Sequence, residues 1–298
     1  MFGALLILSF LSPSPIAERE DVIYGVDDRE EILDVQNLHV SELARSSVSL
    51  VSGDQLRLNT VQAPNGDVDF VFDLSGAPLA QEQNLCPEER FRDQVRGSYC
   101  SGVLISPTRV ATAGHCIVSQ AQCQQTYFVF GFQLQQDRST PTRFNPSQVY
   151  TCDRLIDRVQ EVEGTDWAVI ELERPVEGGR LPVKLSSQLA SNPLPMGLSI
   201  FMLGNPAGIP LKHGKAWVRE DIPGNLFFKT NLDNFFGGSG AAVYNSKTFE
   251  LEGLVTKGEP EDFVLDSQRG CKVSKRCADD ACMGEYVTKV SAFSTLRE

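Results

Sequence analysis

Three side chains of this chain have the types that nucleophilic catalysis needs: His115, Asp166 and Ser239. Serine is a poor nucleophile until a base removes its proton. Histidine can act as that base because its ordinary pKa lies near neutrality. An aspartate beside the histidine would fix the ring tautomer and stabilise the imidazolium that forms. These three residue types therefore predict acyl transfer through a serine nucleophile.

The local sequence around the histidine indicates a rigid position for it. An apolar, β-branched stretch over 100–105 leads into a turn, a second short strand follows, and the segment Ala-Gly-His-Cys ends the unit at 113–116. Proton transfer depends on sub-ångström placement, so a general base is best held on such a corner. A histidine alone is usually structural, so this segment indicates catalysis only together with the aspartate and serine motifs.

The other two candidates also lie at strand ends. Asp166 begins the apolar segment 166–172, and Ser239 lies in Gly-Gly-Ser-Gly ahead of a small-residue strand. A glycine turn of this kind is most often a flexible loop, but three such motifs in one chain favour a catalytic site. Asp153 and Asp157 are alternative acids, although no comparable strand follows them.

The three motifs, in the chain order His, Asp, Ser, resemble those of the chymotrypsin-like (trypsin-like) serine peptidases. The overall sequence pattern is most similar to that of bacterial trypsin-like enzymes related to glutamyl endopeptidases. The resemblance covers residues 86–293 and implies an all-β fold of two six-stranded antiparallel β-barrels, here with an N-terminal leader extension. It also implies a serine endopeptidase that acts on proteins or peptides.

By the same resemblance, the backbone amides of Gly237 and Ser239 form an oxyanion hole, and Cys100 pairs with Cys116. One position departs from the family: Gly238 stands where an aspartate or asparagine usually precedes the nucleophile. This departure motivates an alternative hypothesis, a catalytically inactive, protease-like binding module. Cys123 and Cys152 are expected to form a second disulfide.

Substrate specificity is predicted from positions that match the family's primary pocket. Asp233 lies six residues before Ser239, where trypsin-like enzymes place the carboxylate that binds Arg or Lys. The position of Asp233 implies, by this resemblance, a preference for cleavage after Arg or Lys. Thr256, Lys257 and Gly258 match the opposite wall of the pocket. In an alternative, Lys257 pairs with Asp233 and cancels the charge on which that preference depends.

Three further residues bear on the same pocket. Val255 replaces the histidine that glutamyl endopeptidases use, which disfavours glutamate specificity. Phe235 and Phe236 are expected to form either a hydrophobic rim or part of the core.

The chain is expected to have a leader and one catalytic domain. The apolar N-terminus is too short to span a bilayer and is typical of a signal peptide. An acidic stretch follows, either a propeptide or a set of edge strands. The predicted divisions are a signal peptide at 1–17, a leader at 18–84, and a peptidase domain at 85–298 with barrels over about 85–175 and 190–298.

The peptidase region shows turn residues between short apolar runs, which favours a barrel or sandwich. One short helix is expected over 88–96. Strands are expected at 48–51, 68–74, 102–105, 127–134, 167–172, 198–203, 225–230, 241–244, 251–257 and 286–290.

Composition excludes some functions and favours one compartment. The chain has 27 basic and 39 acidic residues, a net charge of −12, which argues against binding a phosphate backbone. Eight cysteines in a β-rich chain indicate an oxidising, secreted or periplasmic location. Zinc binding by Cys271, Cys277 and Cys282 is an alternative, but their spacing matches no paired knuckle. We expect no cofactor, no metal, no nucleic acid, no stable membrane insertion and a monomer.

Overall fold

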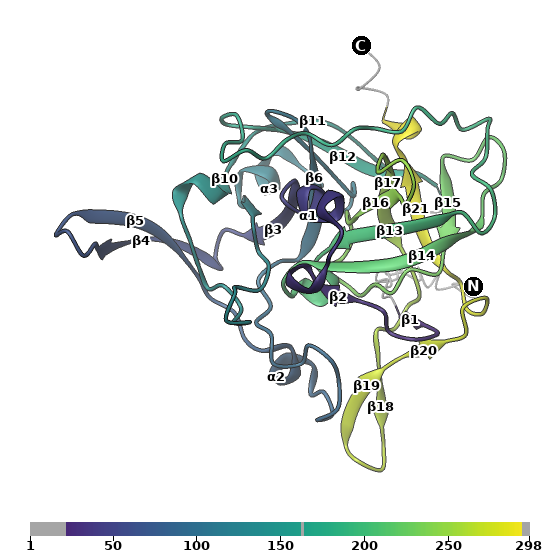
Figure 1. The fold of residues 1–298 in the computed structure, drawn as a ribbon, viewed down its shortest axis with the longest axis horizontal. Coiled ribbons are helices and arrows are strands. Elements are labelled where there is room, and N and C mark those ends of the chain that lie inside the picture. The colour runs from purple at the N-terminus through teal and green to yellow at the C-terminus, as the bar shows by residue number, and fades with distance from the viewer. Residues whose placement is uncertain (1–21, 162–163, 294–298) are drawn as a thin grey trace, which may run out of the picture.

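Two curved, mainly antiparallel β-sheets form the body of the molecule and lie side by side in the computed structural model (Figure 1). The structure describes residues 22–161 and 164–293. The predicted signal peptide at 1–17 lies outside the described residues.

The first sheet has seven strands in the order β10-β8-β3-β6-β7-β12-β11. Its strands are β3 (Ser47–Ser52), β6 (Cys100–Ser106), β7 (Arg109–Thr112), β8 (Thr126–Phe130), β10 (Val149–Tyr150), β11 (Cys152–Gln160) and β12 (Asp166–Leu172). The sheet curls around its own core, which includes Leu50, Leu104, Phe128 and Ile170. All but β3 fall within the predicted first barrel.

The second sheet closes into a barrel because its first and last main strands, β13 and β14, also pair with each other. The order is β13-β16-β17-β21-β15-β14, with β2 added at the outer side of β14. Its strands are β2 (Glu30–Glu31), β13 (Ser199–Gly204), β14 (Lys212–Glu220), β15 (Phe227–Thr230), β16 (Ala242–Asn245), β17 (Leu251–Lys257) and β21 (Glu285–Lys289). The predicted two-barrel, all-β architecture is confirmed.

A further hydrophobic cluster, separate from the core of the first sheet, joins the two sheets. Trp167 and Val103 from the first sheet pack in one cluster with Phe201, Tyr244 and Leu254 from the second. This shared core fixes how the two sheets face each other, and it places the ends of β7, β12 and β17 along one seam.

Residues 22–84 are more closely integrated than the predicted leader. Strand β3 lies in the interior of the first sheet, paired with both β6 and β8, whereas these residues were expected in a propeptide or at a sheet edge. Strand β1 (Ile23–Tyr24) pairs in parallel with β20 (Arg276–Cys277). The buried Val48 and Leu50 give the physical reason, because they complete the core of the first sheet.

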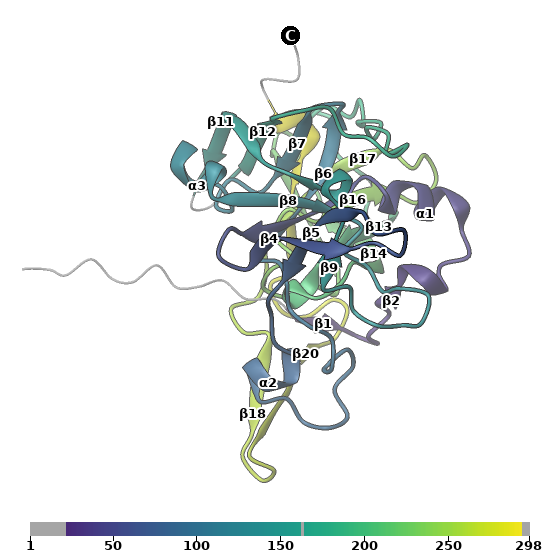
Figure 2. The same cartoon turned by 90° about the vertical axis from the view of Figure 1, so that its left-hand side faces the viewer.

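Two hairpins and three short helices extend from the barrels. Figures 1 and 2 show the hairpin of β4 (Leu56–Gln62) and β5 (Val68–Leu74), which β9 (Arg143–Phe144) joins, and that of β18 (Phe263–Asp266) and β19 (Cys271–Ser274). The helices are α1 (Leu38–Ala44), α2 (Leu79–Gln83) and α3 (Gln120–Gln124).

The helix expected over 88–96 is absent. The segment forms turns in which Phe91 adopts a left-handed φ of 60°, a value incompatible with a continuous right-handed helix. Within the described ranges, no helix has the length and apolarity needed to cross a membrane.

Four disulfides include all eight cysteines. The predicted bonds Cys100–Cys116 and Cys123–Cys152 are present. The pairing that the sequence left open is Cys86–Cys271 and Cys277–Cys282. The zinc alternative is wrong, because its three sulfur atoms are bonded to other sulfurs and none is a free thiolate ligand.

Candidate active site

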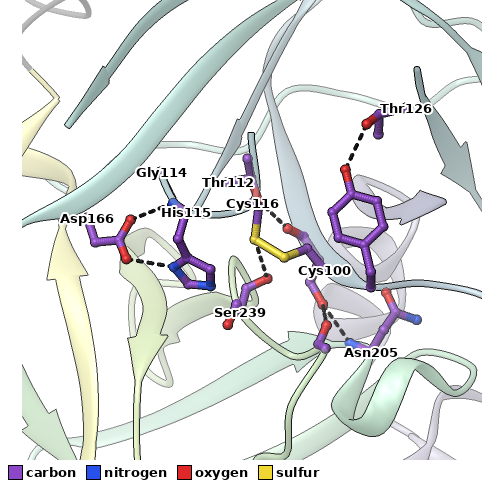
Figure 3. Close-up of a disulfide and its surroundings, with 12 residues drawn as sticks. Cys100, Thr112, Gly114, His115, Cys116, Thr126, Asp166, Asn205 and Ser239 are labelled. Atoms are coloured by element: carbon purple, nitrogen blue, oxygen red, sulfur yellow. Dashed lines mark hydrogen bonds and ion pairs between the residues drawn. A yellow bond between two sulfur atoms is a disulfide. The ribbon is translucent and has the colours of Figure 1, made fainter. Parts of the chain in front are cut away.

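His115 and Asp166 are held together at the seam between the two sheets (Figure 3). The carboxylate of Asp166 accepts two hydrogen bonds from His115, one from the backbone N–H at 2.9 Å and one at Nδ1 at 2.6 Å. Asp166 is buried, whereas the His115 side chain is 32% exposed. This arrangement fixes the ring and leaves its other nitrogen, Nε2, available for proton transfer.

Gly114 allows the close approach of His115 to Asp166. A Cβ atom at position 114 would lie 2.1 Å from the carbonyl oxygen of Val159 and 2.9 Å from Oδ1 of Asp166. The carbonyl of Gly114 also accepts a hydrogen bond from Nε of Arg158 at 3.1 Å. The glycine in Ala-Gly-His-Cys is therefore required by packing against β11 and β12.

The second barrel contributes Thr288 to this cluster, a residue that sequence reasoning missed. The backbone N–H of Asp166 donates to Oγ1 of Thr288 at 3.2 Å. Oγ1 of Thr288 also lies 3.3 Å from Oγ1 of Thr256. Thr256 was predicted to lie near Asp166, and Thr288 provides the contact between them. Nothing in the sequence around Thr288 identifies it, because it lies 122 positions from Asp166.

Ser239 lies on a turn beside the His115 ring. Figure 3 shows its side chain next to the imidazole, with Asp166 on the opposite side of the ring. The carbonyl of Ser239 accepts from the backbone N–H of Ser101 at 2.8 Å and contacts Sγ of Cys116 at 3.8 Å. The Cys100–Cys116 disulfide and strand β6 therefore position both the histidine and the serine.

The backbone amides around Ser239 differ in their hydrogen bonding. Those of Gly238, Gly240 and Ala241 donate to carbonyls of Phe235, Val255 and Gly238. Within the described part of the chain, the amides of Gly237 and Ser239 donate to no acceptor. Two unpaired N–H groups flanking a serine can stabilise negative charge on an oxygen that approaches between them.

The structure gives a physical reason for Gly238. A Cβ atom at this position would lie 1.8 Å from Oδ1 of Asn234. Asn234 is fully buried, and its amide lies 3.5 Å from Glu285. The usual side chain before the nucleophile is therefore excluded by the position that Asn234 occupies.

A buried polar network holds the turn against β6, and its members were also missed. Oγ of Ser101 accepts from the backbone N–H of Asn205 at 2.8 Å and donates to the carbonyl of Gly237 at 3.4 Å. Asn205 is fully buried, accepts from Ser49 and donates to Ile209. Asn205 lies in the Gly-Asn-Pro-Ala-Gly turn, whose sequence predicts only a loop.

The structure contradicts the predicted role of Asp233. Its side chain is buried, and its two oxygens accept from the backbone N–H groups of Tyr24 at 2.7 Å and Asp28 at 3.2 Å. Burial raises the pKa of Asp233 to about 7, although Arg29 and the Tyr24 amide lower it. Asp233 therefore anchors an N-terminal strap, residues 22–31, and is not presented at the base of an open pocket.

The remaining predicted pocket residues lie on or just after β17. Thr256 and Gly258 are buried. Nζ of Lys257 lies 5.3 Å from the ring centroid of Tyr286, and not against Asp233 as one alternative had it.

The two adjacent phenylalanines differ in burial: Phe235 belongs to the core, as one alternative predicted, and Phe236 does not. Phe235 is buried and stacks on Phe263 with ring centroids 4.9 Å apart. Phe236 is 44% exposed and lies three residues before Ser239.

One group of potential metal ligands lies at the site, formed by Cys100, His115 and Cys116. Both sulfur atoms belong to one disulfide, so neither is a thiolate. These residues therefore do not fit a metal ion.

The described geometry is that of a serine hydrolase built on two β-barrels, with a His–Asp pair next to a serine. The family model "Trypsin" matches residues 87–263, more than half of the chain. The chain therefore belongs to the trypsin family, which makes it a serine peptidase by class.

Two other comparisons accompany this result. A solved structure of a Glu endopeptidase in complex with MPD is similar, with 14% identity, a TM-score of 0.50, and coverage of 92% of this chain and 96% of that chain. At this identity the likeness concerns the fold. A search among curated proteins finds no match.

Proposed function

We propose that this chain is a secreted or periplasmic serine endopeptidase in which Ser239 attacks the peptide carbonyl and forms an acyl-enzyme. The observation that carries the proposal is the pair of hydrogen bonds that His115 donates to the Asp166 carboxylate, with Ser239 beside the ring. Four disulfides support an oxidising compartment.

Each proposed step uses a group at the candidate site. Nε2 of His115 accepts the proton of the Ser239 hydroxyl and later delivers it to the leaving amine. Asp166 holds the proton on Nδ1 and stabilises the imidazolium. The unpaired amides of Gly237 and Ser239 stabilise the oxyanion, where each donor typically contributes about 3 kcal/mol.

The proposed peptidase unit includes residues 22–84 and does not start at residue 85. Strand β3 lies inside the first sheet, and the strap binds Asp233 in the second barrel. A unit that began at residue 85 would lose an interior strand and would leave the Asp233 carboxylate buried without its two donors.

Asp233 does not support a preference for Arg or Lys at the scissile bond, because both oxygens of its carboxylate accept hydrogen bonds from the strap. Thr256, Lys257 and Gly258 stay as proposed wall residues, and a peptide-library digest would identify the preferred residue.

A fluorophosphonate probe tests the proposal directly. The full chain should be labelled at Ser239, and Ser239→Ala should lose both labelling and peptide hydrolysis. Ser291→Ala, a change of a serine in the short 3-10 helix Val290–Ala292, is the matched control and should retain both. If the wild-type protein is neither labelled nor able to digest a peptide library, the proposed function is wrong and the alternative of an inactive binding module is favoured.

A further inference from the structure

A cavity of about 190 Å³ lies next to the turn that carries Ser239. Phe236, Asp262, Ala207 and Lys272 are among its lining residues. A volume of this size is below the usual range for small-molecule sites and suits a single amino-acid side chain.

Two extensions of the fold meet at this cavity, and a disulfide joins them. Helix α2 contributes Leu79 and Gln83, while the β18–β19 hairpin contributes Lys272. Next to Lys272, Cys271 bonds to Cys86 of the first extension. The backbone of Lys272 donates to Asn84 at 2.8 Å and accepts from Cys86 at 2.8 Å. The cavity wall is therefore fixed by covalent and hydrogen bonds.

The cavity is connected to the catalytic turn through two of its lining residues. The backbone N–H of Phe236 donates to both oxygens of Asp262, at 3.2 and 3.0 Å. On the other side, Ala207 lies against Gly237, since a Cβ at 237 would lie 3.4 Å from the Ala207 carbonyl carbon. A group bound in the cavity would therefore lie close to the proposed oxyanion site.

The charged side chains at the cavity differ in what they already bind. Arg96 donates to the carbonyl of Ala207 and forms an ion pair with Glu82. The carboxylate of Asp262 is buried and directed at the Phe236 amide. Lys272 is half-buried, and its ammonium forms no ion pair or hydrogen bond with the residues that the structure describes. Lys272 is therefore the cationic group available to a ligand.

The position of His115 indicates which part of a substrate reaches this cavity. The histidine delivers its proton to the leaving amine, so the leaving group must pass beside His115 and the Cys100–Cys116 disulfide. Just before Cys100, the N–H groups of Gly97 and Ser98 donate to Gly208, which adjoins Ala207 at the cavity. The segment before Cys100 is thus bonded to the turn whose Ala207 lines the cavity together with Phe236 and Lys272.

From these contacts we infer that this cavity is a second specificity subsite. It binds an acidic side chain of a substrate residue on the C-terminal side of the scissile bond, through the ammonium of Lys272. The exposed ring of Phe236 covers the aliphatic part of that side chain. This inference rests on the proposed peptidase function and deepens it.

Paired peptide substrates test the subsite. They share the acyl side, taken from the best-cleaved library peptide, and carry Glu, Gln or Lys at each of the first three positions after the scissile bond. At one of these positions, Glu should give about fivefold higher kcat/KM than Gln, the size expected of a half-exposed ion pair. The advantage should shrink in 1 M NaCl, because salt screens such pairs.

Variants at two lysines assign the effect. Lys272→Met should remove the difference between Glu and Gln, and Lys272→Glu should favour the Lys substrate. Lys247→Met, in the exposed turn between β16 and β17, is the matched control and should keep the preference for Glu. A preference for Glu that persists in Lys272→Met would overturn the assignment to Lys272.

A thioester substrate without residues after the scissile bond separates this inference from the proposed function. All lysine variants should hydrolyse it at the wild-type rate. Normal thioester hydrolysis with equal rates for Glu and Gln at all three positions overturns the subsite alone. No hydrolysis of any substrate overturns the proposed function and the subsite with it.

Discussion

Asp166 and Asp233 are both buried carboxylates that accept hydrogen bonds from two N–H groups, but they hold different partners. Asp166 holds an imidazole ring, one side of which reaches solvent. Asp233 holds the backbone of the N-terminal strap at Tyr24 and Asp28. The same local geometry thus serves proton transfer in one region and chain anchoring in the other. What the acceptor binds, and whether that partner reaches solvent, separates the two roles.

Replacing Asp166 with asparagine should have the largest effect on catalysis of any change at the two carboxylates. Asp166→Asn should lower kcat by about 10⁴-fold, because the amide favours the wrong tautomer of His115. The far-UV circular dichroism and the urea midpoint check that the fold is retained. Residual activity near that of the wild-type enzyme would show that Asp166 does not orient the base.

A second change acts on the position of the same histidine. Gly114→Ala should reduce kcat/KM by about 10²-fold, since the new methyl group would displace the loop from the Val159 carbonyl and misplace the ring. Steady-state kinetics on a library-derived peptide measure this loss. Gly214→Ala in β14 is the matched control, because Gly214, like Gly114, has no left-handed φ, and a Cβ there meets no atom closer than 3.6 Å. An equal loss in both variants would argue against a positioning effect.

Thr288→Val should have a smaller effect, about tenfold on kcat with little change in KM. It removes the hydroxyl that accepts from the Asp166 amide, and it leaves a buried donor unpaired. Thr288→Ser should restore most of the activity, because it keeps the acceptor. A valine variant with an altered KM and an unchanged kcat would place Thr288 in substrate binding instead.

Asp233→Asn should leave kcat/KM within about threefold of the wild-type value and lower the free energy of unfolding by about 1–3 kcal/mol. The amide keeps only one acceptor oxygen, so one strap N–H loses its partner. Urea unfolding and peptide hydrolysis measure the two quantities. A large loss of activity toward basic substrates alone would return Asp233 to the specificity pocket.

The pH dependence of the unfolding free energy, compared between the wild type and Asp233→Asn, tests the protonation of Asp233. The pKa of Asp233 is raised from its ordinary 3.8 to about 7, so the folded chain binds this proton more tightly than the unfolded chain. Its contribution to stability is present below about pH 4 and is lost as the pH rises towards 7. The unfolding free energy of wild type minus that of Asp233→Asn should therefore fall across this window. A constant difference would contradict the raised pKa.

The polar strand β14 shows what a search for apolar runs misses. The segment Lys212–Glu220 contains few large apolar residues, and no strand was predicted there. From Gly214 to Val218, however, small or apolar buried positions alternate with the exposed Lys215 and Trp217. A strict test for period-two alternation could have found this part of the strand.

The catalytic candidates were predictable because their signals are local. Residue type defines what His115, Asp166 and Ser239 can do, and their order and neighbouring strands are visible within a few residues of each. The strand pattern likewise reflects short-range alternation, so it predicted a barrel or sandwich. The two-barrel class and the Cys100–Cys116 disulfide were predicted from the resemblance to the chymotrypsin-like peptidases, and Cys123–Cys152 was expected as a second bond.

Tertiary structure alone decided which distant groups meet. The Asp233–Tyr24 bond joins residues 209 positions apart, the Asp166–Thr288 bond joins residues 122 apart, and the Cys86–Cys271 disulfide joins residues 185 apart. Hydrogen-bonding capacity belongs to a residue type, but its partner is selected by how the two sheets pack and by which N–H groups would otherwise be buried unpaired. For this reason the sequence identified the carboxylate of Asp233 and only the folded chain showed what it binds.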